Sequence, residues 1–469
     1  MRSRRALHRT AKFLSLGRSS AKRENSQELK DGSRVGVVGG GPAGSFFSYF
    51  LLRLASRMDL TLHVDIFEPR NFEDIGPKSC NMCGGVVSES LVQNLAAEGI
   101  RLPPGVVQRS LDSYSLHTDV GDAHIATPQA ERRIAAVHRG CGPRDIKQVT
   151  ARSFDAFLLQ RAVDEGARHV RARVLEIGKK DGQTCFTTDD RKQHAYDLVA
   201  VATGINAPAI KFQDGVIPEY SPPAKTKTYI TEACFISRDM VKRYLGSSMH
   251  VFLLNVPRLE FAAIIPKGEY ATICLLGEDI DNNLVRSFME APEVRSCFPP
   301  GWQQSADYCH CAPRINIRPA HKPFADGIVF IGDCGATRLY KDGIGAAYRT
   351  AKAAATTAVF QGISGEDFRR HYQPVCDTIS RDNNIGKLIF AVTRTIQRFK
   401  FLRRGLCRMV TREQQNGRGR PRMSTILWNT FTGSAAYREI LWDALHPAFL
   451  FGFAKDIVAA NLTASKGKR

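Results

Sequence analysis

The sequence of 469 residues contains no run of 18 apolar residues, so we expect no helix that crosses a membrane. Acidic residues are scarce, because 46 Asp and Glu stand against 66 Lys and Arg and leave a net charge of +20. This surplus indicates an anionic partner such as a membrane surface, nucleic acid or a phosphorylated substrate. No secretory signal precedes the 12 scattered cysteines, so we expect a cytoplasmic protein with reduced thiols rather than a disulfide framework.

Metal-ligand patterns are also missing. Cys80 and Cys83 form one C-x-x-C, but no second pair stands at the spacing of a zinc site. His310 lies between Cys309 and Cys311, which is the wrong spacing for a tetrahedral site, and we expect these residues to alternate on a strand. The sequence therefore predicts no metal.

The first 23 residues contain eight Lys or Arg and no acidic residue. This composition predicts a disordered basic arm over residues 1–32, and it also suits an organelle transit peptide. Phe13 is the only aromatic residue before Arg23, whereas single-stranded nucleic-acid binding needs interleaved aromatic side chains. We therefore expect no nucleic-acid partner.

A glycine-rich turn gives the clearest functional signal. The run Val35 to Val38 predicts a buried strand, and Gly39-x-Gly41-Pro42-Ala43-Gly44 follows it directly, ahead of a helix-compatible sequence. Gly39 would permit the turn, Gly41 would let the backbone approach a pyrophosphate, and Gly44 would let the helix pack on the strand. A second predicted strand, 62–67, ends on Glu68, 24 residues after Gly44, where this fold uses a carboxylate to bind a ribose hydroxyl.

The rest of the chain alternates between predicted strands and helices before it changes character. The spacing of apolar residues predicts a helix over 152–166 and buried strands over 170–177 and 196–202. Residues 225–276 are rich in apolar and β-branched residues broken by Pro and Gly, which is typical of an antiparallel sheet. We interpret this sheet as an inserted substrate domain.

A second cofactor signal follows the predicted sheet. The buried strand 327–333 ends in Gly332-Asp333, and the segment 341–347, K-D-G-I-G-A-A, begins a small-residue helix. An acid at a strand end suits a chain of sugar hydroxyls, and a glycine-opened helix N-terminus suits negative charge. The two signals together predict one bound dinucleotide.

These motifs together resemble the geranylgeranyl reductase family, within the group of FAD-dependent flavoproteins that includes the aromatic hydroxylases. The resemblance rests on the glycine turn, the Cys-Gly-Gly segment 83–85, the R-S-F-D-A-F-L segment from Arg152, and the two later glycine segments, and it extends from Ser33 to about Gln361. It implies an α/β protein with an FAD-binding Rossmann-type (glutathione-reductase-like) domain over 33–220 and 312–362. An inserted antiparallel β domain, 221–311, would bind the substrate, and residues 363–469 would form a helical C-terminal region.

The resemblance also implies roles for particular residues. Cys83 would lie beside the isoalloxazine ring as the candidate catalytic residue, although a small buried cysteine beside a turn fits the same pattern. FAD would contact Gly39, Gly41, Pro42, Ala43, Gly44, Glu68, Arg152, Val174 (through its backbone), Gly332, Asp333, Gly343, Ile344 and Gly345. Arg338, Tyr340 and Lys341 depart from the family's usual link between the last two segments. They could face the ring or a charged substrate head, but we expect at least two of them to be surface basic residues.

The implied activity is reduction of a carbon–carbon double bond in an isoprenoid or similar lipid by hydride from reduced flavin. No second dinucleotide motif is present, so NAD(P)H or a ferredoxin would dock transiently as the electron donor. An FAD-dependent monooxygenase, a hydroxylase or epoxidase, is the alternative, which Thr203-Gly204 disfavours because aromatic hydroxylases have Asp-Gly there. Halogenation is disfavoured because none of the three Trp forms W-x-W-x-I-P. A non-catalytic flavin-bearing membrane-binding protein is the alternative of another class.

The C-terminal region shows a basic amphipathic pattern. Apolar residues recur at intervals of three and four residues from Ile389 to Met409, with Arg and Lys between them. Such a helix binds a membrane surface, and a helix docked on the core with a solvated basic face has the same pattern. A last apolar stretch, Leu445 to Leu462, is interrupted by Lys455 and Asp456 and could lie with one face in a membrane. The C-terminal region is therefore predicted either to lie on a membrane surface or to dock on the core.

Overall fold

The computed structural model describes residues 27–80, 83–128, 132–143, 152–235, 237–303, 309–416 and 421–466. Most of the predicted basic arm, residues 1–26, lies outside the described residues. From Gln27 the chain is folded: Leu29 is buried, and the Gln27 carbonyl accepts a 2.8 Å hydrogen bond from the Ile363 amide. Residues 27–32, which the sequence assigned to the arm, therefore belong to the folded part.

A six-stranded, mostly parallel sheet forms one half of the molecule. Its strand order is β21-β22-β12-β1-β2-β8, and only β21 runs antiparallel to its neighbour. The central strand is covered on both faces, which explains its continuous run of apolar residues. The strands are β1 (Arg34–Val38), β2 (His63–Phe67), β8 (Arg168–Val170), β12 (Leu198–Val201), β21 (Phe324–Ala325) and β22 (Ile328–Phe330).

Helices cover one face of this sheet and a smaller sheet covers the other. Val35 and Val37 pack in the core that contains α1 (Pro42–Ser56), α3 (Phe154–Asp164) and α7 (Gly343–Phe360). Val38 points the other way, into the core under a four-stranded sheet of order β11-β10-β9-β13. The strands of that sheet are β9 (Val174–Lys180), β10 (Gln183–Thr188), β11 (Gln193–Tyr196) and β13 (Lys211–Phe212).

A seven-stranded sheet of order β19-β15-β18-β17-β16-β5-β6 forms the second half. Two of its strands, β5 and β6, come from residues 113–126, a range that the sequence assigned to the cofactor domain. The parallel pairing of β5 with β16 joins segments more than 100 residues apart, which local patterns do not reveal. The strands are β5 (Ser113–Thr118), β6 (Gly121–Ala126), β15 (Tyr229–Cys234), β16 (Ser248–Phe252), β17 (Leu259–Lys267), β18 (Tyr270–Gly277) and β19 (His310–Cys311).

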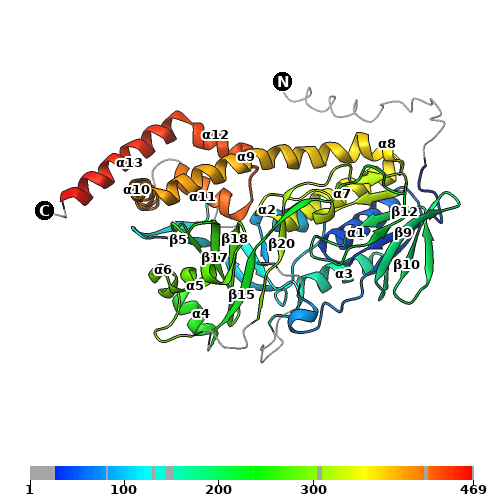
Figure 1. Cartoon of the computed structure of the whole chain (residues 1–469), viewed down its shortest axis with the longest axis horizontal. Coiled ribbons are helices and arrows are strands. Elements are labelled where there is room, and N and C mark those ends of the chain that lie inside the picture. Colours follow the sequence, from blue (N-terminus) through cyan, green and yellow to red (C-terminus); the bar gives the residue numbers. More distant parts are fainter. Residues whose placement is uncertain are drawn as a thin grey trace, which may run out of the picture.

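The two faces of the seven-stranded sheet have different coverings. Along β17, Phe261 and Ala263 point toward the C-terminal helices, whereas Ala262 and Ile264 pack against the short helices α4 (Arg238–Tyr244), α5 (Asn282–Glu290) and α6 (Pro292–Arg295). Figure 1 shows these short helices below the sheet and the C-terminal helices above it. The face toward the C-terminal helices is the one that bounds the cavity described below.

Short elements connect the two halves. A three-stranded sheet of order β3-β7-β4 and a pair of strands, β14 and β20, lie between the large sheets in the chain. These elements are β3 (Val86–Val87), β4 (Val107–Leu111), β7 (Ile134–Val137), β14 (Ala224–Lys227), β20 (Arg314–Arg318), α2 (Glu89–Ala97), η1 (Gly76–Lys78) and η2 (Gly332–Cys334).

The chain ends in a set of helices that spans both halves, with α9 running along the top of the molecule in Figure 1. The amphipathic run that the sequence joined from Ile389 to Met409 is divided at Phe399, whose backbone is extended (φ −103°, ψ 114°). The helices are α8 (Gly365–Asp367), η3 (Phe368–Tyr372), α9 (Gln373–Arg398), α10 (Lys400–Asn416), α11 (Arg422–Thr432), α12 (Tyr437–Leu445) and α13 (Pro447–Lys466).

Across the described ranges, none of these helices combines the length and the apolar character that crossing a membrane requires.

Candidate functional site

The glycine turn after β1 is built around close backbone contacts. Gly39 has a positive φ of 108°, and a Cβ there would lie 2.6 Å from the carbonyl oxygen of Ala202. A Cβ on Gly44 would lie 1.9 Å from the Gly39 oxygen, so only glycine lets α1 start this near the turn. Gly41 is the N-cap of α1, and its Cβ position is free to within 3.6 Å. The helix N-terminus therefore faces an open space at Gly41.

Glu68 follows β2 beside this turn. It is buried, and its Oε2 accepts a 3.1 Å hydrogen bond from the Gly40 amide. Its Oε1 accepts two more of 3.1 Å from the amide and the Nε of Arg70. The carboxylate is therefore held in a fixed orientation at the end of the strand, where a sugar hydroxyl could reach it.

The second predicted segment meets the first. Gly332 has a positive φ of 64°, and a Cβ there would lie 2.7 Å from the Cβ of Ala43 in α1. Asp333 follows and faces the same open space, with its carbonyl accepting a 2.8 Å hydrogen bond from Asn316 Nδ2. Burial raises the pKa of Asp333 above its ordinary value, while Thr337 and Arg139 act to lower it. Asp333 is thus suited to bonding hydroxyl groups.

The N-terminus of α7 differs from the expected arrangement. Gly343 and Ile344 face the open space, but Gly345 does not. The carboxylate of Asp342 lies over the helix N-terminus, where a Cβ on Gly345 would be 2.1 Å from Asp342 Oδ1. Arg349 Nη1 and Nη2 each donate to Asp342 Oδ2 at 3.1 Å. Gly345 therefore lies outside the cavity walls, and its contact with the cofactor stays a prediction.

A cavity of about 540 Å³ connects these segments. Of the residues predicted to bind the cofactor, its walls include Gly39, Gly41, Pro42, Ala43, Glu68, Val174, Asp333, Gly343 and Ile344, together with Cys83. Gly44 and Gly332 lie behind the walls and act through packing. A volume of this size is within the range of ligand pockets, and the walls combine two carboxylates, Glu68 and Asp333, with the N-terminus of α1, which fits a dinucleotide.

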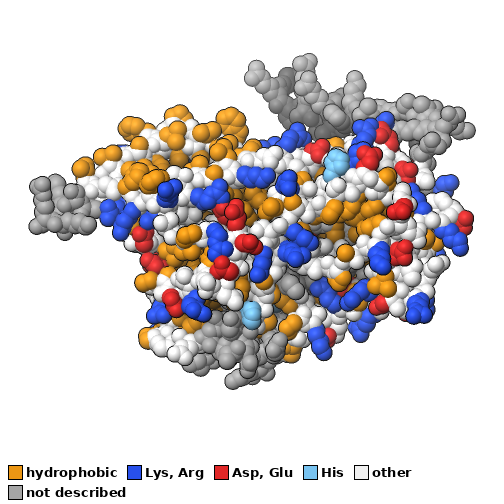
Figure 2. Space-filling view, viewed as in Figure 1, with side chains coloured by type: hydrophobic (Ala, Val, Ile, Leu, Met, Phe, Trp, Pro, Cys, Tyr) orange, Lys and Arg blue, Asp and Glu red, His pale blue; other side chains and the backbone are white. Residues whose placement is uncertain are grey.

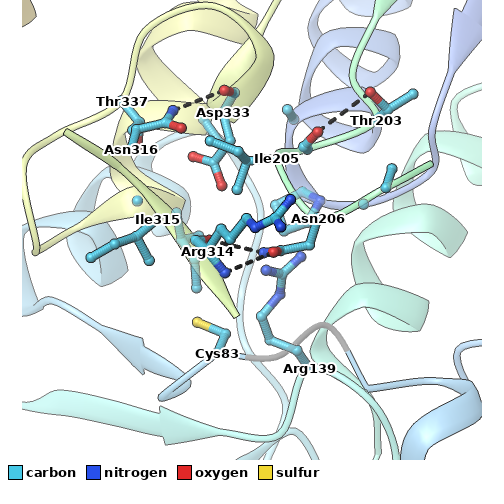
Figure 3. Close-up of a pocket in the computed structure, with 18 of the residues that line it drawn as sticks. Cys83, Arg139, Thr203, Ile205, Asn206, Arg314, Ile315, Asn316, Asp333 and Thr337 are labelled. Carbon is cyan, nitrogen blue, oxygen red and sulfur yellow. Dashed lines mark hydrogen bonds between the residues drawn. The ribbon is translucent and has the colours of Figure 1, made fainter. Parts of the chain in front are cut away.

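Arg139 is an important cavity residue that the sequence analysis missed. Its Nε and Nη2 donate to the two carboxylate oxygens of Asp155 at 2.9 and 2.7 Å. The Asp155 side chain is fully buried, and although burial opposes charge on Arg139, Asp155 raises the pKa of the guanidinium overall. Arg139 Nη2 lies 3.6 Å from the Cβ position of Gly41, beside the phosphate turn. Figure 3 shows it with Cys83 on the side of the cavity opposite Asp333.

Arg152, in contrast, lies outside the cavity walls. Its amide donates to the Gly105 carbonyl at 2.8 Å, and its exposed side chain packs over Gly105. Ser153 caps α3 by accepting from the Ala156 amide, so Arg152 precedes the helix and is turned away from the site. Arg139, and not Arg152, is thus the arginine of this region that lines the cavity. The available signal was Asp155, since a fully buried carboxylate requires a cation as partner.

A reciprocal pair of hydrogen bonds joins a side chain of the cavity wall to the backbone of β20. Asn206 Nδ2 donates to the Arg314 carbonyl at 3.0 Å, and the Arg314 amide donates to Asn206 Oδ1 at 2.8 Å. Both residues lie in the cavity wall, as Figure 3 shows. The loop after Thr203-Gly204 is therefore fixed to the strand that returns from the seven-stranded sheet.

The cavity continues past Cys83 into an apolar part. Its walls there come from one face of the seven-stranded sheet and from α11. Cys83 stands at the boundary between the polar and apolar parts. Its Sγ accepts a weak 3.4 Å hydrogen bond from the Gly85 amide. The apolar wall residues are Ile230, Met249, Phe261, Ala263, Ile265, Cys274, Leu276 and Phe431.

The segment before α7 does not form the exposed link that we expected. Arg338 is buried, with Nη1 and Nη2 donating to the carbonyls of Gly433 and Ala435. Tyr340 and Lys341 both reach the cavity. The Lys341 ammonium lies over the ring of Phe261, and burial lowers the pKa of Lys341 well below its ordinary value. At least two of these three residues were expected on the surface, and that expectation is wrong.

The fold is that of an α/β protein with a mostly parallel sheet and a second, mostly antiparallel sheet, and a cavity lies between the glycine turn and this second sheet. No family model matches the chain, and no curated protein matches its sequence. Solved structures do match it. A geranylgeranyl bacteriochlorophyll reductase-like protein from Thermoplasma acidophilum has a TM-score of 0.60 at 15% identity, over 89% of this chain and 99% of that protein.

Two other matches are flavoenzymes with different reactions. The halogenase PltM has a TM-score of 0.56 at 11% identity, over 93% of each chain, and a variant of it was solved with FAD. The p-nitrophenol 4-monooxygenase PnpA from Pseudomonas putida has a TM-score of 0.53 at 13% identity, over 87% of this chain and 100% of that protein. At these identities the likeness concerns the fold, and at that level the predicted α/β class and the resemblance to this flavoprotein group are confirmed.

Proposed function

We propose that the protein is an FAD-dependent oxidoreductase that reduces carbon–carbon double bonds of an isoprenoid or other lipid. When bound, FAD would supply the reducing equivalents for the double bond. Gly41 and the α1 N-terminus would hold the pyrophosphate, Glu68 the adenosine ribose, and Asp333 the ribityl chain. Arg139, held by Asp155, would add positive charge beside the phosphates.

The apolar part of the cavity supports a lipid as the substrate. Phe261, Ala263 and Ile265 alternate along β17 toward the cavity, and Phe431 of α11 lines the same part with its ring centroid 5.7 Å from that of Phe261. A long unsaturated hydrocarbon chain gains free energy in such a channel because its methylene groups leave water, at about 0.8 kcal/mol each. A small polar substrate would gain little from these walls.

Residues at the boundary of the two parts would position the reacting carbon atoms. Cys83 stands where the polar part of the cavity meets the apolar part. Lys341, over Phe261, stands in the apolar part and would face the reacting end of the chain. The electron donor would be NAD(P)H or a ferredoxin that docks transiently.

An FAD-dependent monooxygenase is the second candidate. The matching fold of a p-nitrophenol monooxygenase favours it, because the same cavity serves both reactions. The two proposals differ in what the reduced protein reacts with first: a lipid double bond in one, oxygen in the other.

Stopped-flow absorbance of the FAD-loaded chain would test the proposal. The protein would be reduced without oxygen, separately with NADPH, NADH and reduced ferredoxin, and then mixed with a polyprenyl lipid or with its saturated analogue. We expect reoxidation by the unsaturated lipid alone. Reoxidation by oxygen and by neither lipid would favour the monooxygenase, and a chain that cannot be loaded with FAD would overturn both candidates.

We also propose that the C-terminal helices contact an anionic membrane surface from which the lipid enters. Ten of the fourteen exposed large apolar residues in the described ranges lie between Leu388 and Leu462, with Trp442 74% exposed and Phe451 76% exposed. Figure 2 shows hydrophobic side chains gathered over the region of α12 and α13. Exposed Arg398, Lys400 and Lys455 in the same helices would meet anionic head groups.

The non-catalytic alternative shares this surface. A flavin-bearing membrane-binding protein would bind anionic vesicles as strongly, but it would not turn over any lipid. Vesicle binding together with failed reoxidation by polyprenyl lipid and by oxygen would favour that reading.

A further inference from the structure

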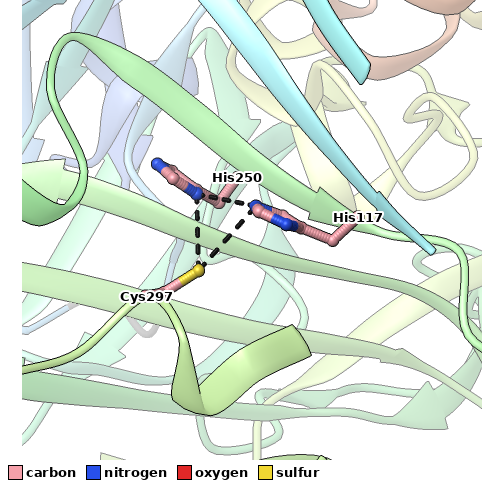
Figure 4. A group of neighbouring side chains, drawn as sticks. All are labelled: His117, His250 and Cys297. Carbon is pink, nitrogen blue, oxygen red and sulfur yellow. Dashed lines mark hydrogen bonds between the residues drawn. The ribbon is translucent and has the colours of Figure 1, made fainter. Parts of the chain in front are cut away.

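Two histidines and a cysteine meet inside the seven-stranded sheet, on its face away from the cavity. His117 of β5 and His250 of β16 are each 6% exposed, and Cys297, just after α6, is 2% exposed. The two strands are parallel neighbours, with Phe252 paired to His117. Figure 4 shows the two rings and the thiol pointing toward one another. This cluster is independent of the candidate cofactor site.

The three facing atoms are spaced much as the ligands of one metal ion. Cys297 Sγ lies 3.4 Å from His250 Nδ1 and 3.8 Å from His117 Nε2, and the two nitrogens are 2.8 Å apart. Zinc bonds of about 2.0–2.1 Å to nitrogen and about 2.3 Å to sulfur put tetrahedral ligands about 3.3–3.6 Å apart. The sulfur distances already fit, and the two rings need to separate by about half an ångström.

The outer ring nitrogens have the partners that metal-binding histidines use. His117 Nδ1 lies 3.0 Å from the Asp122 carboxylate, and His250 Nε2 lies 3.1 Å from the Leu245 carbonyl. Metal-ligating histidines almost always donate their second N–H to a carboxylate or a backbone carbonyl, which fixes the tautomer. Asp122 and Leu245 would do so here.

The centre of the cluster has fewer hydrogen-bond donors than acceptors. A carbonyl and a carboxylate only accept, so each outer nitrogen carries a proton, and in a neutral ring this is the only one. Burial at 6% exposure disfavours a charged imidazolium, and in two neutral rings both inner nitrogens direct lone pairs at each other across 2.8 Å. The one thiol proton of Cys297 can satisfy only one of them. A cation at the centre satisfies both nitrogens and the sulfur together.

We propose that His117, His250 and Cys297 bind one divalent ion of the zinc class. Two imidazoles and a thiolate form a nitrogen and sulfur set that suits zinc, with water in the fourth position. On binding, the Cys297 S–H bond breaks, its electron pair forms the metal–sulfur bond, and the proton leaves to solvent. The ion would fasten the segment after α6 to the two strands, a structural role remote from the cavity.

Metal content of the full chain, prepared without a histidine tag, would test the site. After gel filtration we expect about one zinc per chain, and after exchange with cobalt a thiolate-to-cobalt charge-transfer band in the near ultraviolet. The variant Cys297→Ser should lose that band, and His250→Gln should lower the metal content at least tenfold. Cys185→Ser, a half-buried cysteine in β10, is the matched control and should change neither.

A measurement on the unaltered chain covers the case in which a variant fails to fold. Removing zinc with a chelator should lower the Tm by several degrees, and one equivalent of zinc should restore it. A metal-free chain that takes up no cobalt would show a hydrogen-bonded cluster only and overturn the proposal. A cobalt–thiolate band that survives in Cys297→Ser would place the ion elsewhere and overturn it equally.

Discussion

Arg139 and Asp155 show how single residues decide the character of the cavity wall. Two charges here are taken out of water, and their hydrogen bonds of 2.7 and 2.9 Å compensate much of the desolvation cost. Removing either partner leaves a buried charge without compensation. We therefore read the pair as a fixed positive group beside the phosphate turn.

Cys83 gives the first prediction at this scale. If it positions the reacting atoms, Cys83→Ala should lower the rate of lipid reduction at least tenfold while FAD still binds. The physical reason is its place at the boundary between the polar and apolar parts of the cavity. Stopped-flow rates and the flavin absorption spectrum measure the two effects. Cys185→Ala is the control, and an unchanged rate and spectrum in Cys83→Ala would remove Cys83 from the mechanism.

His138 gives a prediction about pH. It is 6% exposed, and burial together with the charge of Lys267 lowers its pKa well below the ordinary 6.5. The unfolded chain therefore binds a proton below pH 6.5 that the folded chain does not. Stability is fully present above that pH and falls as the pH drops, by up to about 1.4 kcal/mol per pH unit for one group.

Urea unfolding at a series of pH values between neutral and mildly acidic would measure this slope. His138→Gln should be less sensitive to acid than the unaltered chain, with each sample in the same cofactor state. His63→Gln, at an exposed position, should keep the full sensitivity. Equal slopes in all three chains would show that His138 does not titrate in this way.

A site residue could be predicted from the sequence only where it belongs to a local pattern of neighbouring residues. Glu68 and Asp333 end strands, so a local pattern reveals them. His117 and Cys297 are 180 residues apart, and no spacing rule joins them. Arg139 was missed for a similar reason, because its role depends on a carboxylate in a helix that begins 15 residues later. The tertiary fold alone brings such groups together.

At the scale of the element, the turn between β1 and α1 separates a cofactor role from a folding role. A Cβ at Gly41 meets nothing nearer than 3.6 Å, and its φ of −67° suits any residue. Gly41→Ala should therefore fold normally but lose FAD affinity at least tenfold, since the methyl group occupies the space of the pyrophosphate. At Gly44 a Cβ would lie 1.9 Å from the Gly39 oxygen, so Gly44→Ala should displace α1.

Thermal unfolding without cofactor and FAD titration by fluorescence would separate the two effects. We expect the Tm of Gly41→Ala to match that of the unaltered chain, and the Tm of Gly44→Ala to fall clearly. Gly166→Ala is a further comparison, because nothing lies within 4 Å of its Cβ position, although its positive φ of 111° adds strain. Equal FAD affinity in Gly41→Ala and the unaltered chain would contradict the assigned pyrophosphate position.

Elements were predictable where their patterns are local. The Val run of β1 and the small-residue helix α7 follow directly from the sequence. The place of β5 and β6 in the seven-stranded sheet does not, because it depends on the parallel pairing with β16. The division between α9 and α10 at Phe399 was also missed, since the apolar spacing continues through it. Buried Arg403, which donates to Asp119 at 2.6 and 3.0 Å, instead fixes α10 to the sheet.

For the molecule as a whole, its exposed apolar surface is concentrated at one end. The charge of Asp456, which interrupts the last apolar stretch of the sequence, is buried against Arg412 at 2.7 Å and Arg408 at 3.6 Å. The outer face of α13 is therefore left to Phe451 and Val458, both more than half exposed. A surface of this kind favours a membrane as partner because basic residues accompany the apolar ones.

Vesicle binding gives the prediction at this scale. The double variant with Trp442→Glu and Phe451→Glu should bind anionic vesicles at least about tenfold more weakly, because each substitution removes apolar burial worth about 1.5–3 kcal/mol and adds a repelled charge. Co-sedimentation with phosphatidylserine vesicles measures it, and added salt should weaken the unaltered chain as well.

Met58→Glu is the matched control, since Met58 is 51% exposed but lies after α1, away from these helices. It should bind vesicles like the unaltered chain. If it binds as weakly as the double variant, net charge alone governs the interaction and the C-terminal helices have no special part in it. If the double variant binds vesicles normally yet reduces a detergent-dispersed lipid at the usual rate, the exposed face serves another partner. A membrane role requires that the double variant lose vesicle binding and keep turnover of dispersed lipid, because Trp442 and Phe451 lie outside the cavity walls.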